Sequence, residues 1–253
     1  MNLFQETKFI MNQYKITANK GYGQNFLVDE EIVNSIVEKA DVSSEDLVIE
    51  IGPGLGTLTS FLLEKAGKVV CIELDPNMIT VLNDRFSLYN NFELINNDVL
   101  KEDLKLIIDE NLRNLNLKKA KVVANLPYYI TTPIIMKLLE DKLNLESITV
   151  MVQKEVAQRL AENPGGKETG AITYSINYYT VPEIILDVPN TSFIPAPKVD
   201  SAVIKLQVLD KPSVTVKDEG VFFKVIKAAF LQKRKTLINS LSNAKIAEKD
   251  FLE

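Results

Sequence analysis

Residues 47–65 read LVIEIGPGLGTLTSFLLEK, an apolar run followed by a glycine-rich turn and a helical pattern. The apolar run is typical of a strand buried on both faces of a sheet. Gly52, Gly54 and Gly56 follow it, and the segment from Thr57 to Lys65 is predicted to be a helix. A buried strand that enters a helix through a tight glycine turn indicates a doubly wound α/β sheet.

The same alternation continues toward the C-terminus. Asp29 is predicted to cap a helix before the first strand, and Asp75-Pro76 to open one after the second. Further strands are predicted over 68–74, 92–98, 121–126 and 147–152, with helices between and after them. This order predicts a mostly parallel sheet covered by helices on both faces.

The pattern changes after Ala171. Two β-like runs, VPEIILDVP and DSAVIKLQV, flank the proline-rich SFIPAPKVD and predict an antiparallel hairpin that closes the sheet. After Pro212 the pattern is helical. We therefore predict an α/β domain over 1–210, with an irregular N-terminal arm over 1–20. A small all-helical domain is predicted over 211–253, and we expect this domain to be incomplete.

The composition limits the possible chemistry. The 253 residues include one cysteine, Cys71, and no histidine. This excludes a disulfide within the chain, Cys/His metal clusters and histidine-based triads. Cys71 lies in an apolar strand pattern and is predicted to be a small buried hydrophobic residue. Any catalysis must use carboxylates, amides, tyrosine, lysine or a reactive cofactor.

No apolar run approaches the roughly 18–20 residues that span a bilayer. The N-terminus MNLFQETKFIMNQYK lacks the apolar core of a signal peptide. We expect a cytoplasmic protein without a membrane partner.

Acidic side chains stand at the predicted ends of successive strands. Glu50 precedes the glycine loop, Glu73 ends the second strand and Asp98 ends the third. A carboxylate at the position of Glu73 can accept hydrogen bonds from a ribose diol, and one at Asp98 can accept from a base amine. The chain has neither a G-x-G-x-x-G fingerprint nor a phosphate-binding lysine after the loop. The pattern predicts S-adenosylmethionine as cofactor. Taken singly, the loop could be a plain tight turn and each acid a solvated charge.

The fourth strand ends in Asn125-Leu126-Pro127-Tyr128. Asn125 offers a side-chain carbonyl, and Pro127 favours an extended Leu126 whose own carbonyl can point outward. Two such acceptors match an exocyclic amine, and Tyr128 offers a face on which a flat base can stack. Phe193, in the proline-stiffened loop, could stack on the other face of that base. The alternatives are an ordinary turn for the first motif and core packing for Phe193.

The net charge is −5, yet the segment 224–235, KVIKAAFLQKRK, is basic and contains no acid. A local basic patch can bind a polyanion even on an acidic protein. The alternative is a solvated helix face.

Taken together, these motifs resemble those of the ribosomal RNA adenine N6,N6-dimethyltransferases, most closely the bacterial small-subunit type. The resemblance covers about residues 10–245. It is carried by GQNFL (23–27), EIGPGLGTLT (50–59), ELD (73–75), NDVL (97–100), NLPYYITTPI (125–134), MVQKEVAQRL (151–160) and FIPAPKVDSAVIKL (193–206).

The resemblance implies a class I methyltransferase domain with a Rossmann-like sheet, a helical C-terminal domain, and S-adenosylmethionine as methyl donor. It implies dimethylation of two adjacent adenosines in the 3′-terminal hairpin loop of 16S rRNA within the small subunit, by a monomer that also takes part in subunit biogenesis. The cofactor contacts are then expected from Asn25, Leu27, Glu50, Gly52, Gly54, Gly56, Glu73, Asp98 and Asn125. The target-base pocket is expected from Asn125, Leu126, Pro127, Tyr128 and Phe193, and RNA contacts from Lys198, Lys233, Arg234 and Lys235.

Three other functions remain open from the sequence. The related resistance dimethylases that act on 23S rRNA share the N-[LI]-P-Y motif. A ribosome assembly factor with little catalytic role would bind the same RNA, although Asn125 and the cofactor acids argue against a role in binding alone. A DNA adenine methylase would use a similar basic patch.

Overall fold

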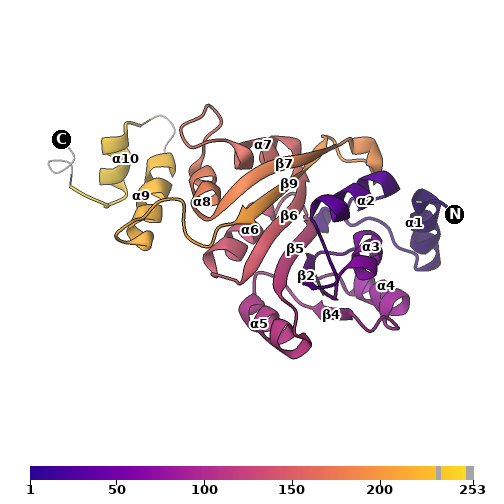
Figure 1. The fold of residues 1–253 in the computed structure, drawn as a ribbon. Coiled ribbons are helices and arrows are strands. Elements are labelled where there is room, and N and C mark those ends of the chain that lie inside the picture. Colours follow the sequence, from indigo (N-terminus) through magenta and orange to yellow (C-terminus); the bar gives the residue numbers. More distant parts are fainter. Residues whose placement is uncertain (232–234, 249–253) are drawn as a thin grey trace.

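A seven-stranded sheet with helices on both faces forms the body of the protein in the computed structural model, which describes residues 1–231 and 235–248 (Figure 1). The strand order is β4-β3-β2-β5-β6-β9-β7. The strands are β2 (Asp46–Ile51), β3 (Lys68–Glu73), β4 (Phe92–Asn96), β5 (Lys119–Asn125), β6 (Leu145–Gln153), β7 (Thr180–Val188) and β9 (Ser201–Val208).

Five neighbouring strands, from β4 to β6, are parallel, and β9 pairs antiparallel with both β6 and β7. The predicted parallel sheet with a closing antiparallel hairpin is thus confirmed. The strand order reverses between β2 and β5, because the chain runs outward through β3 and β4 and then returns to the other side of β2. In such sheets ligands bind outside the carboxyl ends of the strands at this reversal.

The apolar faces of the helices build two cores, one on each side of the sheet. Helices α2 (Glu30–Lys39), α3 (Thr57–Lys65) and α4 (Pro76–Phe86) pack on one face, where their side chains meet Val48, Val69, Cys71 and Val123 of the strands. Helices α5 (Leu104–Leu115), α6 (Thr131–Glu140), α7 (Lys154–Ala161) and α8 (Ala171–Tyr179) pack on the other. Cys71 is fully buried in the first core, as predicted.

The N-terminal region differs from the prediction. The sequence predicts an irregular arm over residues 1–20, but α1 spans Leu3–Gln13. The side chain of Asn2 accepts from the Gln5 N–H, and the Gln5 side chain accepts from the Asn2 N–H, so a capping box starts the helix. Leu3 and Ile10 bury their side chains against the first core. The segment after α1 does lack regular structure, apart from a single 3₁₀ turn (Lys20–Tyr22).

A second strand pairing lies outside the sequence prediction. The short strand β1 (Phe26–Leu27) pairs antiparallel with β8 (Phe193–Ile194), so that Leu27 lies opposite Phe193. This joins the segment before α2 to the proline-rich loop between β7 and β9.

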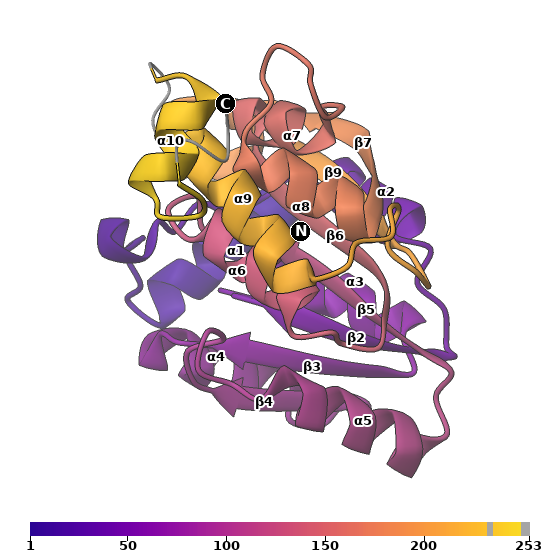
Figure 2. The ribbon, with the colours of Figure 1, turned by 90° about the vertical axis from the view of Figure 1, so that its left-hand side faces the viewer.

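The C-terminal helices α9 (Glu219–Leu231) and α10 (Leu237–Asn243) follow the last strand. Phe223 and Ile226 of α9 pack against Tyr178 of α8. Figure 2 shows α9 running across α8, and in Figure 1 α10 lies at the opposite end of the molecule from α1. None of the helices in residues 1–231 and 235–248 has the length and apolarity needed to cross a bilayer.

Candidate functional site

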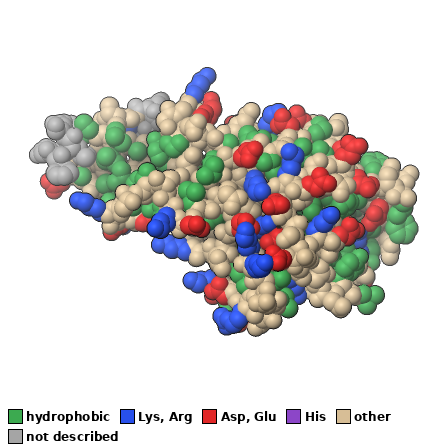
Figure 3. Space-filling view, viewed as in Figure 1, with side chains coloured by type: hydrophobic (Ala, Val, Ile, Leu, Met, Phe, Trp, Pro, Cys, Tyr) green, Lys and Arg blue, Asp and Glu red, His purple; other side chains and the backbone are tan. Residues whose placement is uncertain are grey.

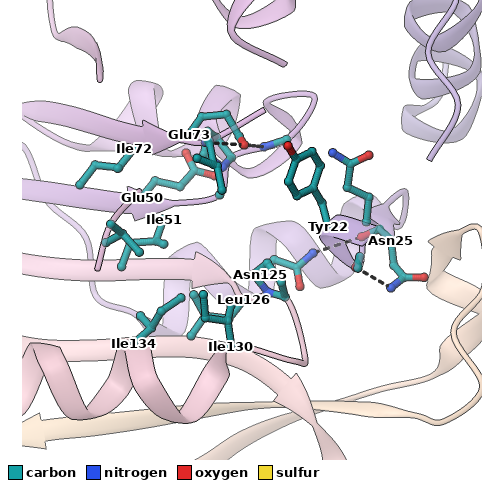
Figure 4. Close-up of a pocket in the computed structure, with 18 of the residues that line it drawn as sticks. Tyr22, Asn25, Glu50, Ile51, Ile72, Glu73, Asn125, Leu126, Ile130 and Ile134 are labelled. Carbon is teal, nitrogen blue, oxygen red and sulfur yellow. Dashed lines mark hydrogen bonds between the residues drawn. The ribbon is translucent and has the colours of Figure 1, made fainter. Parts of the chain in front are cut away.

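A pocket opens at the carboxyl ends of β2, β3 and β5, where the strand order reverses. Its lining comes from five segments of the chain: the arm before α2, the glycine loop after β2, the end of β3, the end of β4 and the loop after β5. Figure 4 shows Glu73 and Asn125 at strand ends, with Tyr22 and Asn25 of the arm facing them. The described residues that line it include three acids, Glu50, Glu73 and Asp98, and no lysine or arginine. Such a lining suits a cationic ligand without phosphate groups.

Glu73 organises the glycine loop. Its Oε2 accepts the Gly54 N–H over 3.1 Å, and its Oε1 accepts the N–H groups of Leu74 and Asp75 over 2.8 and 2.9 Å. Burial raises the pKa of this carboxyl, while the three backbone donors oppose that shift. Gly54 has a φ of +58°, a conformation that side chains rarely adopt, which explains the glycine there.

Gly56 lies outside the pocket lining, although the sequence predicted it as a cofactor residue. Its φ is +82°, and a Cβ at this position would overlap the ring of Phe86. The glycine therefore allows α3 to start close against α4. Its contact is with the core and not with the pocket.

Glu50 lines the pocket but is buried, and its carboxylate is hydrogen-bonded within the protein. The Thr59 hydroxyl donates to Glu50 Oε2 over 2.7 Å, and the Cys71 thiol donates to the same oxygen over 3.4 Å. Burial raises the pKa of Glu50 to about 7. Glu50 therefore supports the glycine loop from behind.

Asp98 lies at the rim of the pocket and is partly exposed. Its Oδ1 accepts the Leu100 N–H over 3.0 Å, and Lys101 lies 3.8 Å from its Oδ2. Among the described residues, Oδ2 therefore has only this long ion pair.

The side-chain amide of Asn125 is oriented by the arm. Its Nδ2 donates to the backbone carbonyl of Asn25 over 3.4 Å, while the Asn25 side chain donates to the Gly23 carbonyl over 3.1 Å (Figure 4). Asn125 Oδ1 accepts no hydrogen bond from the described residues. The Leu126 N–H donates to Met151 O, whereas the Leu126 carbonyl likewise takes no donor from residues 1–231 and 235–248. Within that part of the chain, two acceptors on consecutive residues are therefore free beside the pocket.

Tyr128 lines the pocket half-buried, and its hydroxyl lies 2.7 Å from that of Ser201. Burial raises the pKa of the phenol, and the hydrogen bond to Ser201 opposes the shift. Tyr129 also lines the pocket but is 60% exposed.

Sequence reasoning identified Asp75 only as a helix cap and missed its contact with Gln24. Gln24 Oε1 accepts the Asn19 N–H, and its Nε2 donates to Asp75 Oδ2, both over 2.8 Å. Asp75 is 3% exposed and also caps α4. Gln24 thus ties the arm to the strand end that carries Glu73. The sequence around Gln24 indicates only a turn, and no local pattern reveals a contact 51 residues away.

Phe193 is not brought into the pocket. Its side chain is 3% exposed and packs in the core with Val188 and Leu27, the packing that the sequence allowed as its alternative. Leu27 itself is buried at the pocket edge.

Two of the predicted RNA-contacting residues, Lys198 and Lys235, are absent from the pocket lining. Lys198 and Lys235 are exposed, while Lys233 and Arg234 lie outside the described residues.

Comparison with known proteins identifies the family. The ribosomal RNA adenine dimethylase family matches residues 15–251. The chain belongs to this family. A ribosomal RNA small subunit methyltransferase A from Alkaliphilus metalliredigens is 50% identical over 238 residues, which cover 94% of this chain and 82% of the relative. One from Geobacillus kaustophilus is 50% identical over 237 residues, with 94% and 80% covered.

Two solved structures share the fold of this dimethylase. A dimethyladenosine transferase from Plasmodium falciparum superposes with a TM-score of 0.72 at 30% identity, covering 87% of this chain and 76% of the other. The 23S rRNA methyltransferase ErmE gives 0.69 at 26% identity, covering 87% and 84%. The predicted class I methyltransferase fold, the family and S-adenosylmethionine as cofactor are confirmed. The pocket fits this cofactor, because its acids suit a ribose diol and a cationic sulfonium, and its lining contains no lysine or arginine among the described residues.

Proposed function

We propose that this chain transfers methyl groups from S-adenosylmethionine to N6 of two adjacent adenosines in the 3′-terminal hairpin loop of 16S rRNA. The proposal rests on membership in the rRNA adenine dimethylase family and on relatives that are named for the small subunit. The observation that carries the chemistry is the pair of acceptors, Asn125 Oδ1 and the Leu126 carbonyl, to which no described residue donates at the end of β5.

The two acceptors position the adenine amine. An aromatic amine is a poor nucleophile, because its lone pair is delocalised into the ring. Acceptance of both N–H hydrogens by Asn125 and Leu126 draws the nitrogen toward tetrahedral geometry and frees the lone pair. When bound, S-adenosylmethionine supplies an activated methyl group on a cationic sulfur. Alignment can then supply much of the rate enhancement, so the absence of histidine is no obstacle.

Tyr128 holds the target base, and its half-buried ring offers the face on which the adenine stacks. Pro127 restricts the backbone that leads into Tyr128, and the Pro127 carbonyl accepts the Ile130 N–H over 3.1 Å. The buried Phe193 supports the base pocket through β8, because it pairs with Leu27 of the arm.

The glycine loop and the arm would hold the cofactor between them. Glu73 would receive the ribose hydroxyls, Asp98 would receive the adenine amine, and Asn25, Leu27, Gly52 and Gly54 would line the remainder. Glu50 and Gly56 act indirectly, by holding the loop and α3 in place.

The RNA partner is 16S rRNA in the small subunit or its precursor, bound by a monomer in the cytoplasm. Lys198 and the segment Lys233–Lys235 contact its phosphates. On the face shown in Figure 3, lysines and arginines are interspersed with acids. Ion pairs such as Lys142–Glu219 and Lys227–Glu140 also neutralise individual lysines. RNA contact is therefore confined to local clusters.

Methylation assays with isolated particles test this function. We expect labelled methyl transfer to small subunits that lack the modification, with mass spectrometry locating two dimethyladenosines in the 3′-terminal hairpin. Transfer to large subunits or to DNA instead would assign the chain to one of the rival classes.

Asn125→Ala should lower kcat on the order of a hundredfold, since it removes one of the two positioning acceptors. Asn90→Ala, at an exposed residue outside the pocket, is the matched control. An Asn125→Ala protein that still supports subunit maturation in cells would establish an additional assembly role.

A further inference from the structure

A single hydrogen bond joins the two sequence motifs on which the target-base pocket depends. The Tyr128 hydroxyl, in the loop after β5, lies 2.7 Å from the hydroxyl of Ser201, the first residue of β9. The residues are 73 apart in sequence. Tyr128 belongs to the N-L-P-Y segment, and Ser201 follows directly on the proline-rich loop.

Ser201 is a rigid anchor. It is fully buried, and β9 lies between β6 and β7, so Ser201 pairs with Gln153 on one side and Val188 on the other. The preceding Asp200 is also held, because its carbonyl accepts the Lys154 N–H over 3.0 Å and its side chain accepts the Asn190 N–H over 2.9 Å. A hydroxyl mounted on an interior strand has little freedom to move.

Tyr128 needs such an anchor more than its neighbours do. It sits in a short turn between β5 and α6, and the adjacent Tyr129 is 60% exposed. An aromatic side chain in a turn can rotate about its χ angles unless another group holds it. The hydroxyl lies at the far end of the ring from the backbone, so a bond there fixes the direction in which the ring points and restricts χ1.

We propose that Ser201 is a positioning residue for methyl transfer: its hydroxyl holds the ring of Tyr128 in the position at which it stacks the target adenine beside Asn125 Oδ1 and the Leu126 carbonyl. The inference rests on the proposed function of Tyr128. It extends the reaction machinery to a buried strand residue that lines no part of the pocket.

The test is a double-mutant cycle with Ser201→Ala and Tyr128→Phe. Each change removes one hydroxyl, and Tyr128→Phe keeps the stacking ring. We expect each single variant to lower kcat about threefold to tenfold, the range for loss of one hydrogen bond. The double variant should lose no more than either single one, because both remove the same bond. Cofactor affinity by calorimetry should stay within about twofold of the parent.

Ser201→Thr, which keeps the hydroxyl, should restore kcat and so separates positioning from packing. A spectroscopic readout completes the test, with 2-aminopurine replacing the target adenine in the RNA. Its fluorescence, which stacking quenches, should rise in Ser201→Ala and remain quenched in Ser201→Thr. Ser147→Ala removes the hydroxyl of another buried serine on the neighbouring strand β6 and should leave kcat unchanged.

Additive losses in the double variant, or an unchanged kcat and fluorescence in Ser201→Ala, would overturn the inference. Both results presuppose a parent protein that methylates RNA. A parent without activity would count against the proposed function itself.

Discussion

Three acids near the ends of successive strands look alike in the sequence but occupy three environments. Glu73 accepts three backbone N–H groups and shapes the glycine loop. Glu50 is fully enclosed and hydrogen-bonded to Thr59. Asp98 stays partly exposed at the rim. The alternation of residues along a strand explains part of this, since adjacent positions face opposite sides of the sheet.

Glu73→Ala should weaken cofactor binding by about 1–3 kcal/mol, the cost of leaving buried polar groups without partners. Isothermal titration calorimetry with S-adenosylmethionine measures the change in binding free energy. Glu93→Ala, which removes a 40%-exposed carboxylate on the next strand, is the control. Equal affinity in both variants would contradict the ribose assignment.

Glu50→Gln should change the pH dependence of stability. The pKa of Glu50 is about 7 in the folded protein, against an ordinary value of 4.5. Between pH 4.5 and about 7 the Glu50 carboxyl is therefore protonated in the folded state and mostly ionised in the unfolded state. Stability is therefore lost as the pH rises from about 4.5 to 7, by at most about 3 kcal/mol. Gln cannot ionise, so the variant should lose less stability over that window. Denaturant unfolding at about pH 5 and about pH 8, on either side of most of the titration, measures this. Parallel curves for both proteins would contradict it.

At the scale of elements, packing between helices explains the position of the third glycine, which a cofactor-binding motif does not explain. The early third glycine of the loop departs from the dinucleotide fingerprint, and α3 begins against Phe86 of α4 at this point. In the same way, the turn-like segment before α2 becomes a tethered arm. Its Gln24 reaches Asp75, and its strand β1 pairs with β8.

Gly56→Ala should destabilise the protein by about 2–4 kcal/mol, from left-handed strain together with overpacking against Phe86. Gly165→Ala is a matched control, because Gly165 has a φ of +89° but no described atom within 4 Å of its Cβ position. It therefore carries the strain without the clash. Thermal unfolding compares the stability of the two variants. An equal loss of stability would show that the structure relaxes around the added Cβ at position 56 without cost.

At the scale of the whole molecule, an acidic protein must bind RNA through local clusters. The net charge of −5 opposes general binding to a polyanion, and ion pairs with acids neutralise lysines on and near α9. The basic segment 233–235 and Lys198 are thus the expected RNA contacts.

Charge reversal at Lys233, Arg234 and Lys235 should lower RNA affinity and flatten its dependence on salt. For every phosphate that the protein no longer neutralises, the slope of log K against log salt becomes shallower by about 0.7–0.9. Filter binding from low to high salt measures the slope, and calorimetry should show unchanged cofactor affinity. An unaltered slope would mean that these residues form only a solvated surface.

The sequence by itself determined the order and type of the main elements, since the apolar strands, the capping residues Asp29 and Asp75 and the glycine turn are local signals. It also identified the strand ends that meet at the pocket, because the carboxyl ends of parallel strands share one edge of the sheet. Even the helical identity of residues 3–13 was readable in principle, from the capping box at Asn2.

Only the tertiary structure decided which of these residues face the pocket. Gly56 and Phe193 pack against the core and line no part of the pocket. Gln24 and Asp75 meet across 51 residues, and Tyr128 and Ser201 across 73. The physical reason is that side-chain direction and long-range contacts depend on how the two cores pack on the sheet. Local periodicity carries no information about partners so far apart in the chain.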